Sequence, residues 1–239
     1  MCNRYALTTS QAAIREAANA MRDLTGNLAP QTGIFPDQSA PIIRTGEDGV
    51  RELAMARWGL PSPSRTILEA AGRRADRMLR RGEPADLDLL LKDEPDRGLT
   101  NIRHPESLHW RPYQAAGRRC LVPFTSFSEF NRAAGGDLWF ALTEERPLAF
   151  FAGFWRGGWT GVRTSSKGRE SLDLFGFLTC RPNAEVEAIH PKAMPVILTE
   201  TSEAEVWLSA TWAEARSLQR PLADGSLCIV RRGAPLDDA

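Results

Sequence analysis

The length and composition of the chain indicate a globular fold with no overall charge. Its 239 residues, of which 42% are hydrophobic, suffice to bury a core of ordinary size. The 30 basic residues balance 30 acidic ones, so no long-range field attracts the whole protein to a polyanion. A nucleic acid would therefore have to bind in a local cleft. The chain has no apolar run of about 18 residues and its first residues are too polar for a secretory signal, so we expect neither a membrane span nor export.

The first part of the chain is predicted to form one helix and two extended segments. Ser10 is a suitable N-cap for a helix that runs to about Leu24 and ends at Gly26. Two prolines mark 34–44 as extended, and alternation over 52–58 predicts a strand.

The segment 61–98 differs from its surroundings and is interpreted as a polar helical insertion. Its first half is rich in arginine and its second half in acidic residues. Arg73, Arg77 and Arg80 recur at helical spacing and predict a basic stripe along one helix face. We expect these arginines to pair with the acids of 82–98.

Strands dominate the remainder of the chain. The apolar and alternating stretches predict strands at Cys120–Val122, Leu138–Leu142, Leu148–Trp155, Leu172–Thr179, Met194–Leu198 and Leu227–Val230. A last helix is predicted over 202–218, followed by a C-terminal strand and tail over about 220–239. Many strands that do not alternate with helices indicate an α+β fold, which we expect to form a single sheet-rich domain over residues 1–239.

The cysteines and histidines show no metal-binding pattern. No two cysteines have the two-residue spacing of a zinc site, so we expect neither a metal nor a cofactor. Cys120, Cys180 and Cys228 lie in strand-like stretches and are interpreted as small core residues with free thiols. Cys2 is different because it becomes the N-terminal residue once Met1 is removed.

An N-terminal cysteine is a 1,2-aminothiol, which has a chemistry that no internal residue shares. Its amine condenses with an aldehyde to an imine, and its thiol then closes a five-membered thiazolidine ring. The α-amine has a pKa near 7.7–8.0, against about 10.4 for lysine, so a useful fraction is neutral and nucleophilic near pH 7. The thiol, with an unperturbed pKa near 8.5, supplies accessible thiolate. Cys2 is therefore the candidate nucleophile for an aldehyde.

Five sequence blocks occur in a fixed order along the chain. They are Met1–Tyr5, Arg57–Leu60, Asn101–Arg103, Arg119–Pro123 continuing to Phe127–Phe130, and Ile189–His190 continuing to Met194–Leu198. Together they resemble the SRAP family, the SOS response-associated peptidases. The resemblance runs from residue 2 to about residue 212 and leaves out most of 61–98. It implies a barrel-like core of mostly antiparallel strands with flanking helices.

The resemblance implies a monomeric sensor of abasic sites in single-stranded DNA. Family members trap the sugar aldehyde as a thiazolidine crosslink on the N-terminal cysteine, which they expose by removing the initiator Met. By position, Cys2 would be the nucleophile, Glu129 would move protons, and His190 would help the sugar ring to open. Asn101 would hold the reacting groups in place, and Arg4 and Arg103 would grip phosphates. Such a protein would be cytoplasmic and would associate with the nucleoid when it acts.

The residue types suit these roles. A histidine titrates near neutrality, and arginine offers a fork of donors to a phosphate. Glu129 is hard to place in a core, because its strand is otherwise apolar. Trp58, with Phe35 and Pro36, is a candidate for a wedge that unstacks bases beside the lesion. On the same view, the arginine stripe of 61–98 could form an arm that contacts DNA.

The chain departs from the family pattern at several points. Asn3 stands where family members usually have glycine. The segment from His190 to Pro195 has one extra residue, with Lys192 where the family has arginine. Ser128 and Phe130 replace the aromatic residues that usually flank the glutamate.

Two other functions fit the same residues. Cys2 could attack amides as the nucleophile of a true peptidase, assisted by Glu129 and His190. Alternatively, a divergent relative could bind single-stranded DNA without any chemistry. A peptidase would turn over added peptide, whereas a crosslinking protein is consumed stoichiometrically.

Overall fold

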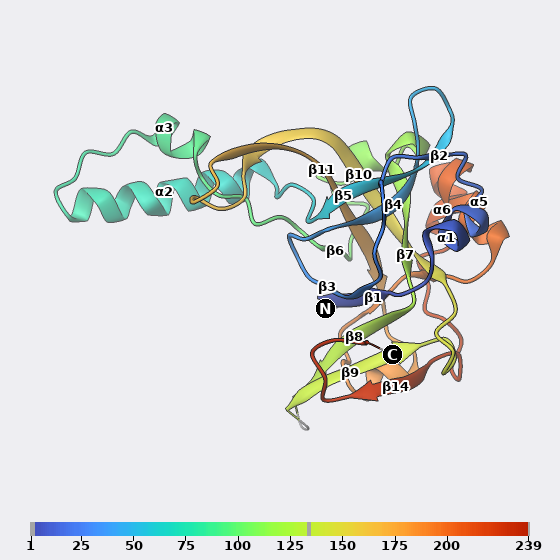
Figure 1. The fold of residues 1–239 in the computed structure, drawn as a ribbon. Coiled ribbons are helices and arrows are strands. Elements are labelled where there is room, and N and C mark those ends of the chain that lie inside the picture. Colours follow the sequence, from blue (N-terminus) through green and yellow to red (C-terminus); the bar gives the residue numbers. More distant parts are fainter. Residues whose placement is uncertain (1–2, 133–134, 239) are drawn as a thin grey trace.

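The computed structural model describes residues 3–132 and 135–238, which form a strand-rich body and a projecting helical arm (Figure 1). Among these residues, five strands close into a barrel: β4 (Ser39–Thr45), β5 (Arg51–Trp58), β7 (Arg119–Phe124), β10 (Ala149–Val162) and β11 (Arg169–Cys180). Neighbouring strands pair in the order β11-β10-β7-β4-β5. The ring closes because β5 also pairs with β11, with Trp58 opposite Phe175.

A second sheet packs below the barrel in the view of Figure 1. Its order is β14-β9-β8-β1-β3, formed by β1 (Arg4–Leu7), β3 (Gln31–Ile34), β8 (Ser126–Asn131), β9 (Gly136–Ala141) and β14 (Cys228–Arg232). Thr125 alone separates β7 from β8, so the chain passes directly from the barrel into this sheet. Strand β1 lies between β8 and β3.

Short elements complete the body. They are the strands β2 (Arg22–Asp23), β6 (Asn101–Ile102), β12 (Met194–Pro195) and β13 (Ile197–Leu198), the helices α1 (Gln11–Ala17), α4 (Ala184–Glu187), α5 (Thr201–Ser209) and α6 (Trp212–Arg216), and the 3-10 turns η1 (Arg111–Tyr113) and η2 (Ala116–Arg118). Most strand pairs are antiparallel; the pairs β2–β5, β5–β11 and β6–β11 are parallel. The prediction of a sheet-rich α+β fold with a barrel-like core and flanking helices is confirmed.

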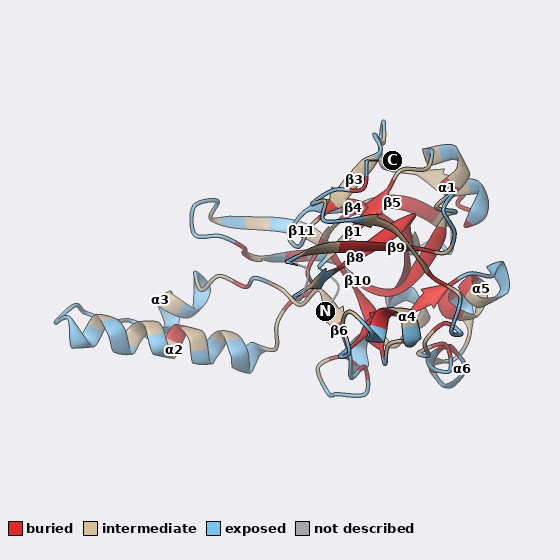
Figure 2. Cartoon of the chain, turned by 90° about the horizontal axis from the view of Figure 1, so that it is seen from below, coloured by how far each residue is buried: buried red, intermediate tan, exposed pale blue. Residues whose placement is uncertain are grey.

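Aromatic side chains fill the space between the barrel and the second sheet. Tyr5 of β1 makes edge-on contacts with Trp58 and Phe151, at ring-centroid distances of 5.2 and 5.6 Å. Trp58 stacks on Phe177 at 5.1 Å. These residues are buried, and Figure 2 shows the buried positions concentrated in the strands of the body. Burial of several aromatic rings supplies much of the apolar area that holds the two sheets together.

Two helix predictions were too long. Ser10 caps α1 as expected, but the helix ends at Ala17, because Asn19 adopts a φ of 51° and the chain then pairs with β5 as β2. The predicted helix 202–218 is instead the pair α5 and α6. Thr211 separates them because its hydroxyl accepts the amide hydrogen of Glu214 and so caps a new helix.

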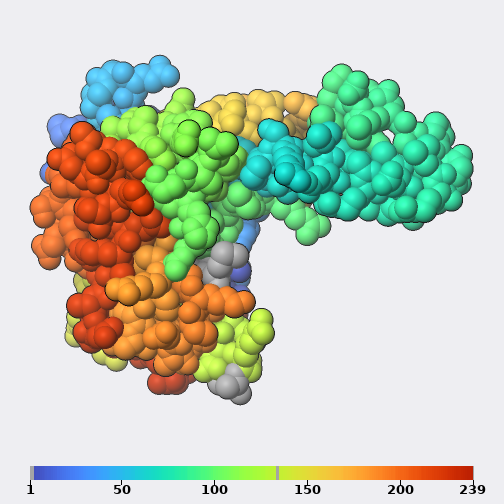
Figure 3. Space-filling model, turned by 180° about the vertical axis from the view of Figure 1, so that it is seen from behind, coloured from blue at the N-terminus to red at the C-terminus, as the bar shows by residue number. Residues whose placement is uncertain are grey.

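The insertion forms an arm of two helices, α2 (Ser64–Arg80) and α3 (Leu87–Lys92). Figures 1 and 3 show it standing away from the body. Ala71 is the buried residue of α2, and α3 has none. Arg73, Arg77 and Arg80 are exposed, as a stripe requires. Arg74 lies 3.7 Å from Glu94, so the expected pairing with the acidic half involves a neighbour of the predicted stripe.

The two chain segments that join the arm to the barrel, around Leu60 and Leu99, form a neck that backbone hydrogen bonds hold together. Strands β5 and β6 both pair with β11, with Trp58 opposite Phe175 and Asn101 opposite Phe177, so the arm interrupts one line of pairing. Leu60 and Leu99 exchange backbone hydrogen bonds of 2.9 and 2.7 Å across the neck. Gly98 has a φ of 77°, and a Cβ there would collide with the buried Arg163 side chain. Only glycine meets both demands at this position.

Candidate active site

Glu129 and His190 meet at the end of strand β8. The Nδ1 atom of His190 lies 3.7 Å from Oε2 of Glu129. Their side chains are 3% and 19% exposed, so water reaches this pair mainly through the histidine. The two residues are 61 positions apart in the sequence, and the fold brings their side chains together.

Local structure explains both positions. Glu129 alternates with Ser128 along β8 and shares its face with the buried Phe127, so its carboxyl group points toward the interior. His190 follows the short helix α4, which Asn183 caps through its side-chain oxygen. The backbone amide of His190 donates to the carbonyl of Val186 at 2.7 Å, which fixes the histidine just after the helix.

Burial shifts the pKa values of the two groups in opposite directions. Burial, together with the negative charge of Asp137, raises the pKa of Glu129 to about 7. Burial also lowers the pKa of His190, as do the positive charges of Lys192 and Arg132. Near neutral pH, the carboxyl group therefore still holds a proton much of the time, while the imidazole is largely neutral. A proton donor and a proton acceptor are thus adjacent.

The raised pKa of Glu129 predicts that Glu129→Gln stabilises the fold at alkaline pH. The ordinary pKa of 4.5 applies to the unfolded chain, and the folded value is about 7. Between these values the folded protein holds a proton that the unfolded chain has released, so its stability falls as the pH rises. Glutamine cannot ionise, so the variant should be more stable than the parent at pH 8 by roughly 1–3 kcal/mol.

Urea unfolding of both proteins at pH 8 and pH 4.5 measures this difference. The advantage of Glu129→Gln should disappear at the lower pH, where both chains carry a neutral side chain at position 129. An equal stability difference at the two pH values would contradict the raised pKa.

Arg4 lies beside this pair. It stands opposite Ser128 in the pairing of β1 with β8, one residue from Glu129. Its guanidinium forms an ion pair with Asp137 and stacks over the ring of Phe35 at 4.7 Å. In the structure Arg4 thus reaches across β8 to Asp137 of β9, and its contact with a phosphate stays a prediction.

Asp137 was not anticipated from the sequence. It accepts hydrogen bonds from Arg4 and, at 3.1 Å, from the hydroxyl of Ser128, and its charge raises the pKa of Glu129. The sequence signal that could have found it is the pair Gly135 and Gly136 directly before it, which is typical of a hairpin connection. Antiparallel pairing of β8 with β9, which begins at Gly136, sets Asp137 opposite Phe130, next to the glutamate.

Asn101 and Arg103 lie on a neighbouring part of the surface. Asn101 is in β6, half-buried, and its side-chain amide donates to the hydroxyl of Thr100 at 2.8 Å. Arg103 is exposed and lines a pocket of about 470 Å³ together with Pro191 and Lys192, the two residues that follow His190. Arg103 and the histidine segment therefore face a common hollow.

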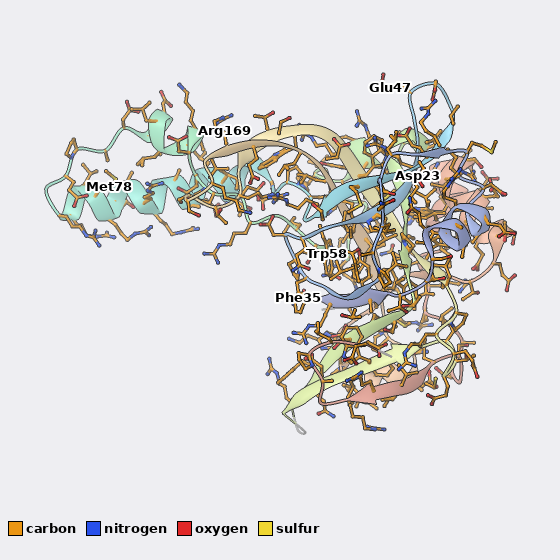
Figure 4. All side chains as sticks on the ribbon, viewed as in Figure 1. Asp23, Phe35, Glu47, Trp58, Met78 and Arg169 are labelled. Carbon is orange, nitrogen blue, oxygen red and sulfur yellow. The ribbon has the colours of Figure 1, made fainter. Side chains whose placement is uncertain are left out.

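The structure argues against a base-stacking role for Trp58. Its ring is fully buried, and its indole N–H donates to the carbonyl of Thr100 at 3.0 Å. Stacking on a base would require the ring to leave the core. Pro36 is exposed and Phe35 is half-buried, so these two neighbours are accessible in the way that the predicted wedge requires. Figure 4 shows Phe35 at the margin of the body and Trp58 further inside.

The predicted nucleophile, Cys2, lies outside the described residues. Of the other cysteines, Cys120 and Cys180 are buried and Cys228 is partly exposed, and all three are free thiols.

Within residues 3–132 and 135–238, no group of three or more His, Cys, Asp or Glu side chains is arranged to hold a metal ion. No helix in this part of the chain is long and apolar enough to cross a membrane.

Three solved structures resemble this fold. A protein from Bacteroides thetaiotaomicron has a TM-score of 0.62 at 20% identity, covering 95% of this chain and 90% of its own. A phage-related protein from Bordetella bronchiseptica has a TM-score of 0.61 at 16% identity, covering 95% and 92%. A further protein from Bordetella bronchiseptica has a TM-score of 0.59 at 20% identity, covering 95% and 97%. At 16–20% sequence identity, these similarities show a shared fold and say nothing of a shared activity.

Comparison with protein sequences identifies the family of the chain. No curated protein matches the chain. The profile of the family described as SOS response associated peptidase (SRAP) matches residues 1–79 and 91–231. The unmatched interval, 80–90, is the tip of the arm. Because the match spans nearly the whole chain, this protein is a member of the SRAP family.

Proposed function

We propose that this protein captures the ring-opened aldehyde of an abasic site in single-stranded DNA as a thiazolidine on Cys2. The observation that carries the proposal is the Glu129–His190 pair, in which 3.7 Å separates Oε2 from Nδ1, the pKa of the carboxyl group is raised to about 7 and the pKa of the imidazole is lowered. Imine formation and ring opening both require proton transfers near neutral pH, and this pair is suited to them. Membership of an SOS-associated family supports a role in the response to DNA damage.

The position of the pair relative to the N-terminal segment supports the proposal. Strand β1 begins at Arg4, opposite Ser128. Two residues of extended chain span at most about 7 Å, so Cys2 is tethered close to the end of β8 that carries Glu129. This short distance along the chain supports placing the Cys2 amine at the Glu129–His190 pair in the proposed reaction.

The proposed reaction needs no oxidant, reductant or cofactor. His190 accepts the proton of the sugar's anomeric hydroxyl group as the bond between the anomeric carbon and the ring oxygen breaks. It returns that proton to the ring oxygen, so that the products are an open-chain aldehyde and a hydroxyl group. The neutral Cys2 amine adds to the carbonyl carbon, and one of its protons passes to the oxygen. Glu129 donates its own proton so that this oxygen leaves as water, and it then takes up the last proton of the nitrogen, which gives an imine. The thiol then adds across the C=N bond, its proton passes to the nitrogen, and the thiazolidine is complete.

The remaining candidate residues would position the DNA. Arg103 faces the hollow next to His190 and could hold a phosphate there, and Asn101 lies two residues before it. Arg4 and the exposed Pro36 would contact the strand near Phe35. We also propose that Met1 is removed by the protein itself, and that residues 1–239 act as one domain with the arm as an insertion.

A denaturing gel tests the proposal directly. Protein with an N-terminal Cys2, verified by mass, is mixed with a single-stranded oligonucleotide that contains one abasic site. A shifted band should form without borohydride, because ring closure protects the imine. An undamaged oligonucleotide is the control, and the absence of a band with abasic DNA would overturn the proposal.

A peptidase is the second candidate, favoured by the family's description. The same amine and thiol would then attack an amide, and the protein would release many equivalents of product. Incubation with a Met-Cys peptide separates the two functions, since multiple turnovers support the peptidase and a single-equivalent adduct with abasic DNA supports the crosslink.

A further inference from the structure

A second and larger groove lies between the arm and the hairpin formed by β10 and β11. It has a volume of about 1220 Å³ and shares no lining residue with the pocket near His190. Its walls come from the start of α2, the end of α3, the turns around η1 and η2, and the far ends of β10 and β11. Arg169, which lies where this hairpin meets the arm in Figure 4, donates to the carbonyl of Lys92 at 2.7 Å and links the two walls.

The charged side chains that face solvent in this groove are basic. Five exposed basic residues line it: Arg65, Lys92, Arg118, Arg156 and Arg169. They come from the arm, the η2 turn and both strands of the hairpin, so positive charge surrounds the groove on several sides. In a chain with no net charge, such a concentration creates a local positive field.

The two acidic residues that line the groove, Asp96 and Glu94, already have partners within the protein. Asp96 is buried and accepts hydrogen bonds from the backbone amides of Ser62 and Gly98, both at 2.9 Å. The carboxylate of Glu94 is only 13% exposed and lies 3.7 Å from Arg74. The acids of the lining therefore hold the neck of the arm together. Arg65 pairs with Glu69, outside the lining, at 2.8 Å, and Lys92, Arg118, Arg156 and Arg169 are left to act on a ligand.

The aromatic residues of the groove are mostly covered. Tyr113 and Trp159 are only 6% and 8% exposed, and the Arg163 guanidinium covers the Trp159 ring at 4.6 Å. Little ring surface is left for stacking on bases. A ligand would therefore be recognised through its charge, which is how proteins contact a phosphate backbone regardless of its sequence.

We propose that this groove binds the phosphate backbone of single-stranded DNA at undamaged nucleotides, apart from the Cys2 site. The choice of a single strand rests on the proposed function, whereas the anionic character of the ligand rests on the charges of the groove. Arginine predominates among the cations, which suits phosphate oxygens because its planar fork donates two parallel hydrogen bonds. The groove, rather than the predicted stripe of Arg73, Arg77 and Arg80, is then the DNA-contacting part of the arm region.

Salt-dependent binding of an undamaged, fluorescent single-stranded oligonucleotide tests the groove. The variant Arg118→Ala/Arg156→Ala removes two exposed cations from it, and Arg73→Ala/Arg77→Ala removes two exposed cations from the arm outside it. Each phosphate contact contributes about −0.7 to the slope of log K against log salt. The groove variant should lose about 1.4 of that slope and roughly 10-fold or more in affinity at about 0.1 M salt, and the control should match the parent.

An unchanged slope in the groove variant would overturn the proposal, as would an equal loss in the control. A polyglutamate peptide that displaces the oligonucleotide at equal charge concentration would also overturn it, because the groove would then favour acidic protein. The probe contains no abasic site, so this result does not depend on Cys2. If the groove variant loses slope while parent protein forms no crosslink, the groove stands and the proposed function fails.

Discussion

Replacing Cys2 by alanine is expected to abolish the heat-stable adduct with abasic DNA. The alanine amine can still form an imine, but no thiol is present to close the ring, so water reverses the imine during denaturation. Borohydride should recover a band with the variant by reducing the imine to an amine. Gel analysis with and without borohydride therefore separates the two steps of the proposed reaction.

Cys228→Ala is the matched control, because Cys228 is a partly exposed free thiol in β14. Its adduct yield should equal that of the parent. Cys2→Ser should give a weaker band, since an oxygen nucleophile adds to the imine less readily than a thiolate. A stable adduct at parental yield from Cys2→Ala would rule out the thiazolidine.

The second large effect is expected at the buried acid–base pair. Glu129→Gln keeps the size of the side chain but cannot exchange a proton, and His190→Gln keeps a polar group without a titrating ring. Each should slow crosslink formation by about 10²-fold or more, the range typical of a positioned proton-transfer group. The measurement is the rate of adduct formation at saturating abasic DNA, with the exposed Glu144→Gln as control.

The pKa of Glu129 also predicts the direction in which the rate of adduct formation changes with pH. With the pKa of Glu129 at about 7, the proton-donating form is abundant below pH 7 and declines above it. The parental rate should therefore fall as the pH rises from 7 to 9, once the ionisation of the Cys2 amine is measured separately and allowed for. A parental profile that Glu129→Gln reproduces in both rate and shape would show that another group moves the proton.

The sequence predicted much of the barrel because alternation and apolar runs mark its strands. It also directed attention to Glu129, since a carboxyl group between Phe127 and Phe130 needs a reason. The nearness of His190 followed from the family resemblance alone. No local pattern links two residues on separate elements, and only the pairing of β8 and the position of α4 bring them to 3.7 Å.

Other features depended on tertiary contacts that a linear pattern does not contain. The helix after Ser10 was overextended because pairing of residues 22–23 with β5 outweighs local helix propensity. Trp58 was a candidate for the wedge that unstacks bases, but closure of the barrel by β5 and β11 buries it. The burial of Asp96 and Glu94 could not be foreseen either, and it is this burial that leaves the groove positive.

The way in which β5 and β6 share β11 keeps the barrel strands paired whatever the length of the arm beyond its contacts with the barrel. The neck at Leu60 and Leu99 keeps its geometry whatever lies beyond it, and doubling the length of a flexible loop costs only about 0.6 kcal/mol of closure free energy. The family profile omits residues 80–90, at the far tip. This tip is consequently a natural insertion point, where evolution or an engineer can attach a whole new module while the chemistry at Glu129 and His190 is left undisturbed.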